Sequence, residues 1–296
     1  MKSISAELIA SYHTIAGDVP ALGAPGGDAG RVVERDFSKF DFRLRMEVAS
    51  KVGYTGAGLS HPDLVKVASQ YGYGGIKSIL ADNGIVNFEF EFIVDWFADG
   101  ERRRRSDQTR DLLLRAAEAI GARHVKVGGD MNGESWPVDL LTESFAALCD
   151  DAAKAGTNIV IEILPWSNFY DIDSALKIIA GAEKPNGGLC VDIWHLARRG
   201  IPYEEIRNIP KQYLKHIEVN DADQKVFGSL FEDSARRRKL CGEGSLNVRK
   251  FLSVVKGMGY NGPIGVEIIS DEHMQRSLED AAEQSFRTAM REFDAA

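Results

Sequence analysis

Four carboxylates stand between β-branched residues in short strand-like runs, all in the second half of a chain of 296 residues. The runs are Ile161-Glu162-Ile163, Val191-Asp192-Ile193, Ile217-Glu218-Val219 and Val266-Glu267-Ile268. Side chains alternate between the two faces of a strand, so the apolar neighbours point one way and the acid points the other. Each run follows helix-like sequence. This arrangement predicts that the four acids share one inward-facing site.

Such a site requires positive charge. At an effective dielectric constant of about 20, two carboxylates roughly 4 Å apart repel each other by about 4 kcal/mol. A divalent cation is the simplest way to offset that repulsion. Oxygen ligands suit Mn²⁺ or Mg²⁺, and a nearby imidazole lets Co²⁺ or Zn²⁺ compete. Two histidines are placed to supply it: His195 lies three residues after Asp192, and His216 lies two residues before Glu218 on the same strand face.

Three other side chains near these acids have more than one interpretation each. Lys126 faces inward on its predicted strand, where it binds a substrate anion, stabilises an enolate or only neutralises Glu162. Trp166 and Phe169 follow the strand of Glu162, where they stack on a sugar or aromatic ring or simply pack the loop.

Strand-like and helix-like stretches alternate along the whole chain. The predicted strands are 7–15, 56–60, 85–92, 124–129, 158–164, 188–193, 214–220 and 263–269. The predicted helices are 41–52, 62–82, 106–121 (capped by Ser106), 138–155, 171–183, 203–208, 247–258 and 274–293. The alternation predicts right-handed βαβ units and a parallel sheet. Eight repeats favour an α/β fold of the closed (β/α)8 TIM-barrel type over an open sheet, as a single domain over residues 1–296.

Long segments after the first and seventh strands, 17–30 and 221–244, lie on the face where barrel enzymes build their sites. Segments of this length are lids or binding loops, or else surface decoration. No GxGxxG follows the first strand, which argues against a dinucleotide cofactor.

Composition narrows the class of protein. The net charge of −8 argues against a nucleic-acid partner, and the basic run Arg102–Arg105 is expected to begin a solvated helix. No apolar run approaches the ~18 residues of a membrane span, and the N-terminus lacks the core of a signal peptide. Three cysteines without CxxC spacing indicate a reducing compartment. We therefore expect a cytoplasmic protein without a membrane partner, whose oligomeric state, including a homo-oligomer, stays open.

The order of these motifs resembles a known superfamily. Glu162, Asp192-x-x-His195, His216-Ile-Glu218-Val-Asn-Asp221, Gly242-Glu243-Gly244 and Gly259-Tyr260-x-Gly262-Pro263-Ile-Gly-Val-Glu267 resemble the xylose isomerase-like TIM barrels. Its members include sugar-phosphate isomerases and epimerases, ketose 3-epimerases, inositol-pathway dehydratases and endonuclease IV. The last is disfavoured, because its trinuclear zinc site needs more histidines than the six present here.

The resemblance implies a metal site and a substrate site. In the ketose epimerases, Glu, Asp, His and Glu hold one Mn²⁺ or Co²⁺, and the two glutamates move a proton beside the carbonyl. Those positions fall on Glu162, Asp192, Glu218 and Glu267, so Glu218 replaces the usual histidine and His216 is the alternative ligand.

The predicted substrate contacts are those of His195, His216, Lys126, Trp166 and Asn168, and of these His195 matches the family's histidine that contacts substrate oxygens. Asn168 stands where the epimerases have a second glutamate, and Ala222 stands where they have an arginine. The substrate contacts are therefore expected to differ from those of the ketose epimerases.

The resulting prediction is a metal-dependent isomerase or epimerase of carbohydrate metabolism. It would act on a sugar, keto-sugar or polyol derivative by proton transfer α to a carbonyl, through an enediolate, with Glu162 and Glu267 as catalytic residues and Mn²⁺ as the expected ion. Loss of a β-leaving group from the same intermediate gives the alternative, a dehydratase or lyase acting on a sugar-derived or cyclic hydroxy-ketone. A third reading is a sugar-binding subunit without turnover.

Overall fold

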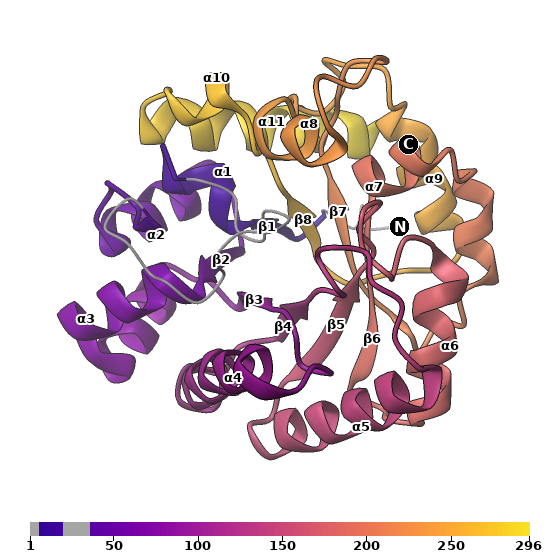
Figure 1. The fold of residues 1–296 in the computed structure, drawn as a ribbon. Coiled ribbons are helices and arrows are strands. Elements are labelled where there is room, and N and C mark those ends of the chain that lie inside the picture. Colours follow the sequence, from indigo (N-terminus) through magenta and orange to yellow (C-terminus); the bar gives the residue numbers. More distant parts are fainter. Residues whose placement is uncertain (1–5, 20–35) are drawn as a thin grey trace.

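Eight parallel strands form the centre of the computed structural model, which describes residues 6–19 and 36–296 (Figure 1). Each strand pairs with the next in sequence order and β8 pairs with β1, so the sheet closes into a barrel. The strands are β1 (Leu8–Ala10), β2 (Gly56–Ser60), β3 (Asn87–Ile93), β4 (His124–Val127), β5 (Asn158–Glu162), β6 (Gly187–Asp192), β7 (Leu214–Val219) and β8 (Ile264–Val266). The predicted TIM barrel is confirmed.

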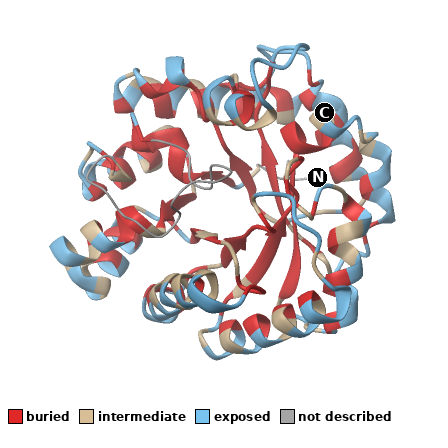
Figure 2. Ribbon diagram, in the orientation of Figure 1, coloured by how far each residue is buried: buried red, intermediate tan, exposed pale blue. Residues whose placement is uncertain are grey.

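Helices surround the barrel (Figure 1). They are α1 (Tyr12–Ala16), α2 (Phe42–Val52), α3 (His61–Asp82), α4 (Gly100–Ile120), α5 (Val138–Lys154), α6 (Ile172–Ala182), α7 (Ile193–Arg199), η2 (Tyr203–Asn208), α8 (Leu230–Arg236), α9 (Val248–Gly257), α10 (Asp271–Met274) and α11 (Leu278–Asp294). Figure 2 shows the strands buried and the outer helix surfaces exposed. None of the helices in the described ranges combines the length and apolar character needed to cross a membrane.

Strand β3 shows how the sequence sorts side chains between the two sides of the barrel wall. Its sequence, Asn-Phe-Glu-Phe-Glu-Phe-Ile, alternates aromatic and acidic residues. Phe88 packs edge-on against Phe42 of α2, with ring centroids 6.3 Å apart, so this face is turned toward the helices. Glu89 and Glu91 are buried on the other face. The strand therefore delivers two acids to the barrel interior.

The first predicted strand, 7–15, is wrong in its second half. Only Leu8–Ala10 are in β1, and Tyr12–Ala16 form α1. The backbone turns because the Thr14 N–H donates to the Ser11 carbonyl at 2.9 Å and the Thr14 hydroxyl donates to the Val266 carbonyl at 2.7 Å. All of α1 is buried, and a short segment buried on every side has no periodicity that separates helix from strand.

The predicted start of the helix 106–121 is also wrong. Helix α4 begins at Gly100 rather than Ser106, and Ser106 is buried inside it instead of capping it. The run Arg102–Arg105 lies in its first turns, as predicted. Hydrogen bonds hold Arg102 in place, because its guanidinium donates to Asp95 and Asp130, each at 2.7 Å.

Of the two long segments, only 221–244 lies wholly within the described residues. Of 17–30, residues 20–30 lie outside the described residues. The segment 221–244 contains α8, whose Ser229 and Glu232 form a reciprocal capping box. Isolated bridges from Asp221 to Lys239 and from Arg237 to Ser270 fold this segment over the barrel mouth.

Candidate functional site: a carboxylate cluster at the barrel mouth

The four predicted acids meet at one point. Glu162 ends β5, Asp192 ends β6, Glu218 precedes the last residue of β7, and Glu267 follows β8. Asp192 and Glu218 are direct partners in the strand register. One carboxylate oxygen from each of the four lies within 4.8 Å of the others, and all four side chains are buried. Alternation along parallel strands therefore places the acids as the sequence predicted.

Lys126 on β4 binds three carboxylates from inside the barrel. Its ammonium nitrogen lies 2.6 Å from Glu91 Oε2, 2.8 Å from Glu218 Oε1 and 2.9 Å from Glu267 Oε1. The side chain is 1% exposed. Burial alone would lower the pKa of Lys126, but the surrounding carboxylates raise it well above its usual value. Lys126 therefore stays protonated, and its ammonium group pairs with Glu91, Glu218 and Glu267 rather than with Glu162.

Arg238 supplies the second buried cation. Its Nη1 lies 2.6 Å from Asp192 Oδ2 and 2.7 Å from Glu267 Oε2. The Arg238 N–H donates to the Ile269 carbonyl at 3.1 Å, and its Nε donates to the Ser234 carbonyl at 3.1 Å. These bonds hold the segment after α8 so that the guanidinium enters the mouth.

Neutral side chains complete the hydrogen bonding of the acids. The Asn220 amide donates to both Asp192 oxygens at 3.1 and 3.0 Å. The Ser11 hydroxyl and the Cys190 thiol donate to Glu218 at 3.1 and 3.3 Å. His195 Nε2 lies 3.0 Å from Glu162 Oε1. Each acid is thus oriented by at least one fixed partner.

The pKa values of the buried side chains at the mouth are shifted in opposite directions. Burial raises the pKa of Glu162 to about 8, although Lys126 lowers it, and burial raises the pKa of Glu91 to about 8 in the same way. Burial also acts to raise the pKa of Glu218, but the Lys126 ammonium and the His216 imidazole together outweigh it and hold that pKa well below its usual value. Burial lowers the pKa of His195 to about 4, so its imidazole is neutral at pH 7.

This donor set suits a divalent cation. Among the described residues, five buried carboxyl groups, counting Glu91, face two protein cations, so this cluster keeps excess negative charge when the acids ionise. Four of these groups converge within ligand distance of one centre. Clustered carboxylate oxygens are the ligands of Mg²⁺, Mn²⁺ and Ca²⁺ rather than of soft metals. The carboxylates that would hold the ion are Glu162, Asp192, Glu218 and Glu267.

The remaining predicted residues separate into two groups. His195 and Trp166 line the mouth cavity together with Glu162 and Glu267. His216 does not join the four acids: its Nε2 lies 3.5 Å from Glu218 Oε1, one layer deeper in the barrel. The geometry thus places Glu218, and not His216, together with the other three acids.

Two residues near the end of β5 point away from the acids. The Asn168 Oδ1 accepts from the Asp130 N–H at 2.7 Å, outside the mouth cavity. Phe169 is 1% exposed and stacks on Trp96, with ring centroids 6.1 Å apart, so it packs the loop rather than facing a ligand.

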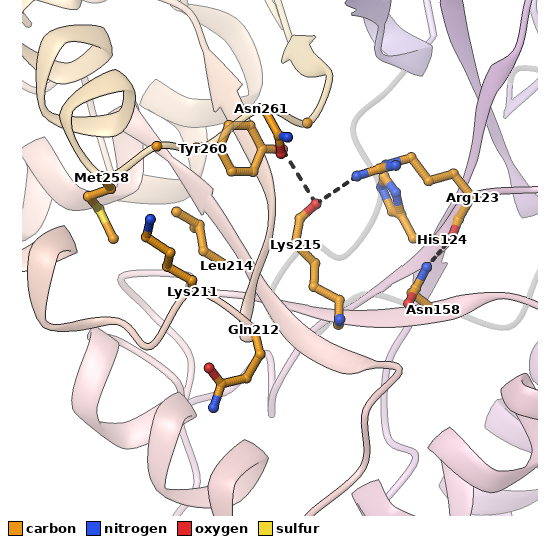
Figure 3. A pocket seen from close by; sticks show the side chains of 12 residues that line it. Arg123, His124, Asn158, Lys211, Gln212, Leu214, Lys215, Met258, Tyr260 and Asn261 are labelled. Carbon is orange, nitrogen blue, oxygen red and sulfur yellow. Dashed lines mark hydrogen bonds between the residues drawn. The ribbon is translucent and has the colours of Figure 1, made fainter.

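Two cavities open at opposite ends of the barrel. The mouth cavity measures about 60 Å³ and is roofed in part by Phe231 and Arg238. A larger cavity of about 350 Å³ lies at the N-terminal ends of the strands. Figure 3 shows Arg123 there, reaching the Lys215 carbonyl, with His124 beside it. We place the chemistry at the smaller cavity because the ionisable cluster is there.

Sequence reasoning missed Glu91 and Arg238. The alternation in β3 carried the same signal as the four recognised acids, since Glu91 also stands between apolar residues. The position of Arg238 could not be predicted in this way, because it follows a helix inside a segment without strand periodicity.

Residues 46–293 match the Xylose isomerase-like TIM barrel family. Because this match covers most of the sequence, the chain belongs to that family.

Curated relatives are a dehydratase and an isomerase. The chain is 26% identical to "3-dehydroshikimate dehydratase" of Pseudomonas putida over 233 residues, which covers 77% of this chain and 36% of that protein. It is 27% identical to "Inosose isomerase" of Halalkalibacterium halodurans over 148 residues, 49% of each chain. The chain therefore spans only about a third to a half of the length of these relatives.

A solved structure shares the whole fold. The crystal structure titled "IOLI protein with a binding zinc atom" superposes with a TM-score of 0.80 at 15% identity, covering 97% of this chain and 98% of that one. At this identity the likeness concerns the fold.

Proposed function

We propose that the protein is a metal-dependent isomerase or epimerase that acts on a sugar, keto-sugar or polyol derivative by proton transfer at the carbon beside a carbonyl. One observation carries this proposal: of the four clustered acids, Glu162 and Glu267 are the two that line the mouth cavity. Two carboxyl groups that face one small cavity can act as the general base that removes a proton and the general acid that returns it.

The two glutamates have different partners. Glu267 is paired with both Lys126 and Arg238, at 2.9 and 2.7 Å, and we assign it the role of the base. Burial raises the pKa of Glu162 to about 8, so in the metal-free protein it carries a proton at pH 7 that it shares with the neutral His195. A bound divalent ion would stabilise negative charge on the substrate oxygens.

The size of the mouth cavity sets a condition on substrate binding. Ligand pockets usually measure about 300–1,000 Å³, several times the 60 Å³ present here. Phe231 of α8 and Arg238 after it form part of the lining. We infer that the segment that carries α8 moves outward when substrate enters, which would also release Arg238 from Asp192 and Glu267.

Elimination is the second candidate function. The dehydratase relative matches a larger share of this chain than the isomerase relative does, 77% against 49%. After the base removes the α-proton, a C–O bond at the β-carbon breaks, a C=C bond forms, and the hydroxyl leaves as water with a proton from an acid. Glu162 with His195 is placed to give that proton.

The test follows deuterium from D₂O into the substrate by NMR, with Mn²⁺ present and with 3-dehydroshikimate, inosose and ketohexoses as probes. We expect exchange by the wild type and none by Glu162→Gln or Glu267→Gln. Glu272→Gln, whose side chain is 86% exposed, is the matched control and should exchange normally.

Each result has one reading. Exchange without loss of water supports the isomerase or epimerase, and loss of water supports the dehydratase or lyase. Wild-type turnover in both active-site variants contradicts the proposed bases. Ligand binding without exchange across the panel supports the third reading, a sugar-binding subunit.

A further inference from the structure

A second cluster of ligand-type side chains lies one layer below the mouth acids, inside the barrel. It consists of Glu89 on β3, His124 on β4 and His216 on β7. Glu89 and His124 are register partners on neighbouring strands, and the two imidazole centroids are 4.4 Å apart. None of the three side chains is more than 1% exposed. Barrel interiors are usually filled by branched apolar residues, so this layer is an exception.

The polar atoms of this inner cluster lack partners. Neither oxygen of Glu89 and none of the four ring nitrogens of His124 and His216 has a partner with hydrogen-bond geometry. The two Nε2 atoms nevertheless converge on one atom, Glu89 Oε2, at 3.1 Å from His124 and 3.4 Å from His216. Buried polar groups are almost always satisfied, so three unpartnered groups that each turn one ligand atom toward the same point indicate a species bound between them.

The spacing matches that of ligands around one ion. In a tetrahedral zinc site with bonds of about 2.0–2.1 Å, ligand atoms lie about 3.3–3.4 Å apart. The two nitrogen–oxygen distances fall close to that value. Two imidazoles and one carboxylate are also a ligand set that zinc uses in proteins, with the fourth position open.

Two glycines leave the room that this arrangement needs. A Cβ at Gly265 on β8 would lie 2.8 Å from His216 Nε2, and a Cβ at Gly58 on β2 would lie 3.2 Å from Glu89 Oε1. Any side chain at either position would press on a member of the cluster. Both positions therefore keep the inner layer open.

We propose that Glu89, His124 and His216 form a second metal site, which takes Zn²⁺ and is separate from the carboxylate site at the mouth. Glu218 lies between the two sites, since its Oε1 is 2.8 Å from Lys126 and 3.5 Å from His216 Nε2. The approach to the inner site is from the opposite end of the barrel, where His124 lines the cavity of about 350 Å³ (Figure 3).

The test measures zinc per chain by mass spectrometry, after production with zinc and dialysis against metal-free buffer. Asp192→Asn disables the mouth site alone and should retain about one zinc. The double variant Asp192→Asn/Glu89→Gln should retain less than about a tenth of that. Equal zinc in these two variants, with both folded by circular dichroism, would overturn the inner site.

A wild-type crystal decides the question without any variant. Anomalous scattering at the zinc edge should give a peak about 2.0–2.1 Å from both Nε2 atoms and from one Glu89 oxygen. A zinc-supplied crystal without that peak overturns the proposal. The result is distinct from that for the proposed function: if the mouth binds no metal, the wild type and Asp192→Asn both hold one zinc, and Glu89→Gln holds none.

Discussion

Lys126→Met should destabilise the metal-free protein strongly, because it removes the ammonium group that three buried carboxylates share. Its three contacts measure 2.6, 2.8 and 2.9 Å. At an effective dielectric constant of about 20, each contact is worth roughly 6 kcal/mol before the ammonium's desolvation is subtracted. Removal of one partner of a buried ion pair costs about 3–5 kcal/mol net, and we expect a loss in that range.

The assay is urea unfolding at pH 7 with EDTA, so that no metal replaces the missing charge. Lys154→Met is the matched control: Lys154 is 77% exposed, and we expect a change within about 0.5 kcal/mol. Addition of Glu218→Gln to Lys126→Met removes one of the stranded acids. The double variant should therefore be less destabilised than the sum of the single variants, by at least about 1 kcal/mol.

A Lys126→Met protein that unfolds at the wild-type urea concentration would refute the electrostatic reasoning. Strict additivity in the double variant would refute the pairing with Glu218. Lys126→Met should also gain more stability than the wild type when Mn²⁺ is added, because the ion then faces one competing cation fewer.

Three further predictions concern other parts of the site. Gly265→Ala should lower stability by about 1–3 kcal/mol in urea, since its Cβ would lie 2.7 Å from Glu218 Cγ; an unchanged midpoint contradicts the close approach. Asn220→Ala should weaken Mn²⁺ binding by about 10–100-fold in a titration, because it removes both hydrogen bonds to Asp192, and an unchanged Kd would exclude that role. Burial lowers the pKa of His13 to about 4. The unfolded chain, with a histidine pKa of about 6.5, takes up the proton first, so stability should fall by about 3 kcal/mol between pH 6.5 and 4. His13→Gln should flatten that slope in urea unfolding, and an unaltered slope would show that His13 does not contribute.

Strand alternation accounts for most of what the sequence could predict. Because parallel strands end at one rim, Glu162, Asp192, Glu218 and Glu267 could be brought together from spacing alone. The same rule applied to Asn-Phe-Glu-Phe-Glu-Phe in β3 would have found Glu89 and Glu91. These two acids were within reach of sequence reasoning.

Other features depend on tertiary contacts that no local pattern encodes. Arg238 enters the mouth because backbone bonds to Ile269 and the capped helix α8 turn its segment inward. The turn from β1 to α1 depends on a hydroxyl contact from Thr14 to Val266, 252 residues away in sequence. The sequence predicted that a metal ion would supply the positive charge that the acids require. In the structure, the side chains of Lys126 and Arg238 supply part of that charge.

Electron paramagnetic resonance of Mn²⁺ tests the central claim, that the mouth acids hold a divalent ion, most directly. Free Mn²⁺ gives a six-line spectrum that is lost on binding. We predict that the wild type and Glu89→Gln each remove about one Mn²⁺ per chain from that signal, and that Asp192→Asn removes almost none. Undiminished free Mn²⁺ with the wild type, or equal binding by Asp192→Asn, would contradict a metal site among Glu162, Asp192, Glu218 and Glu267.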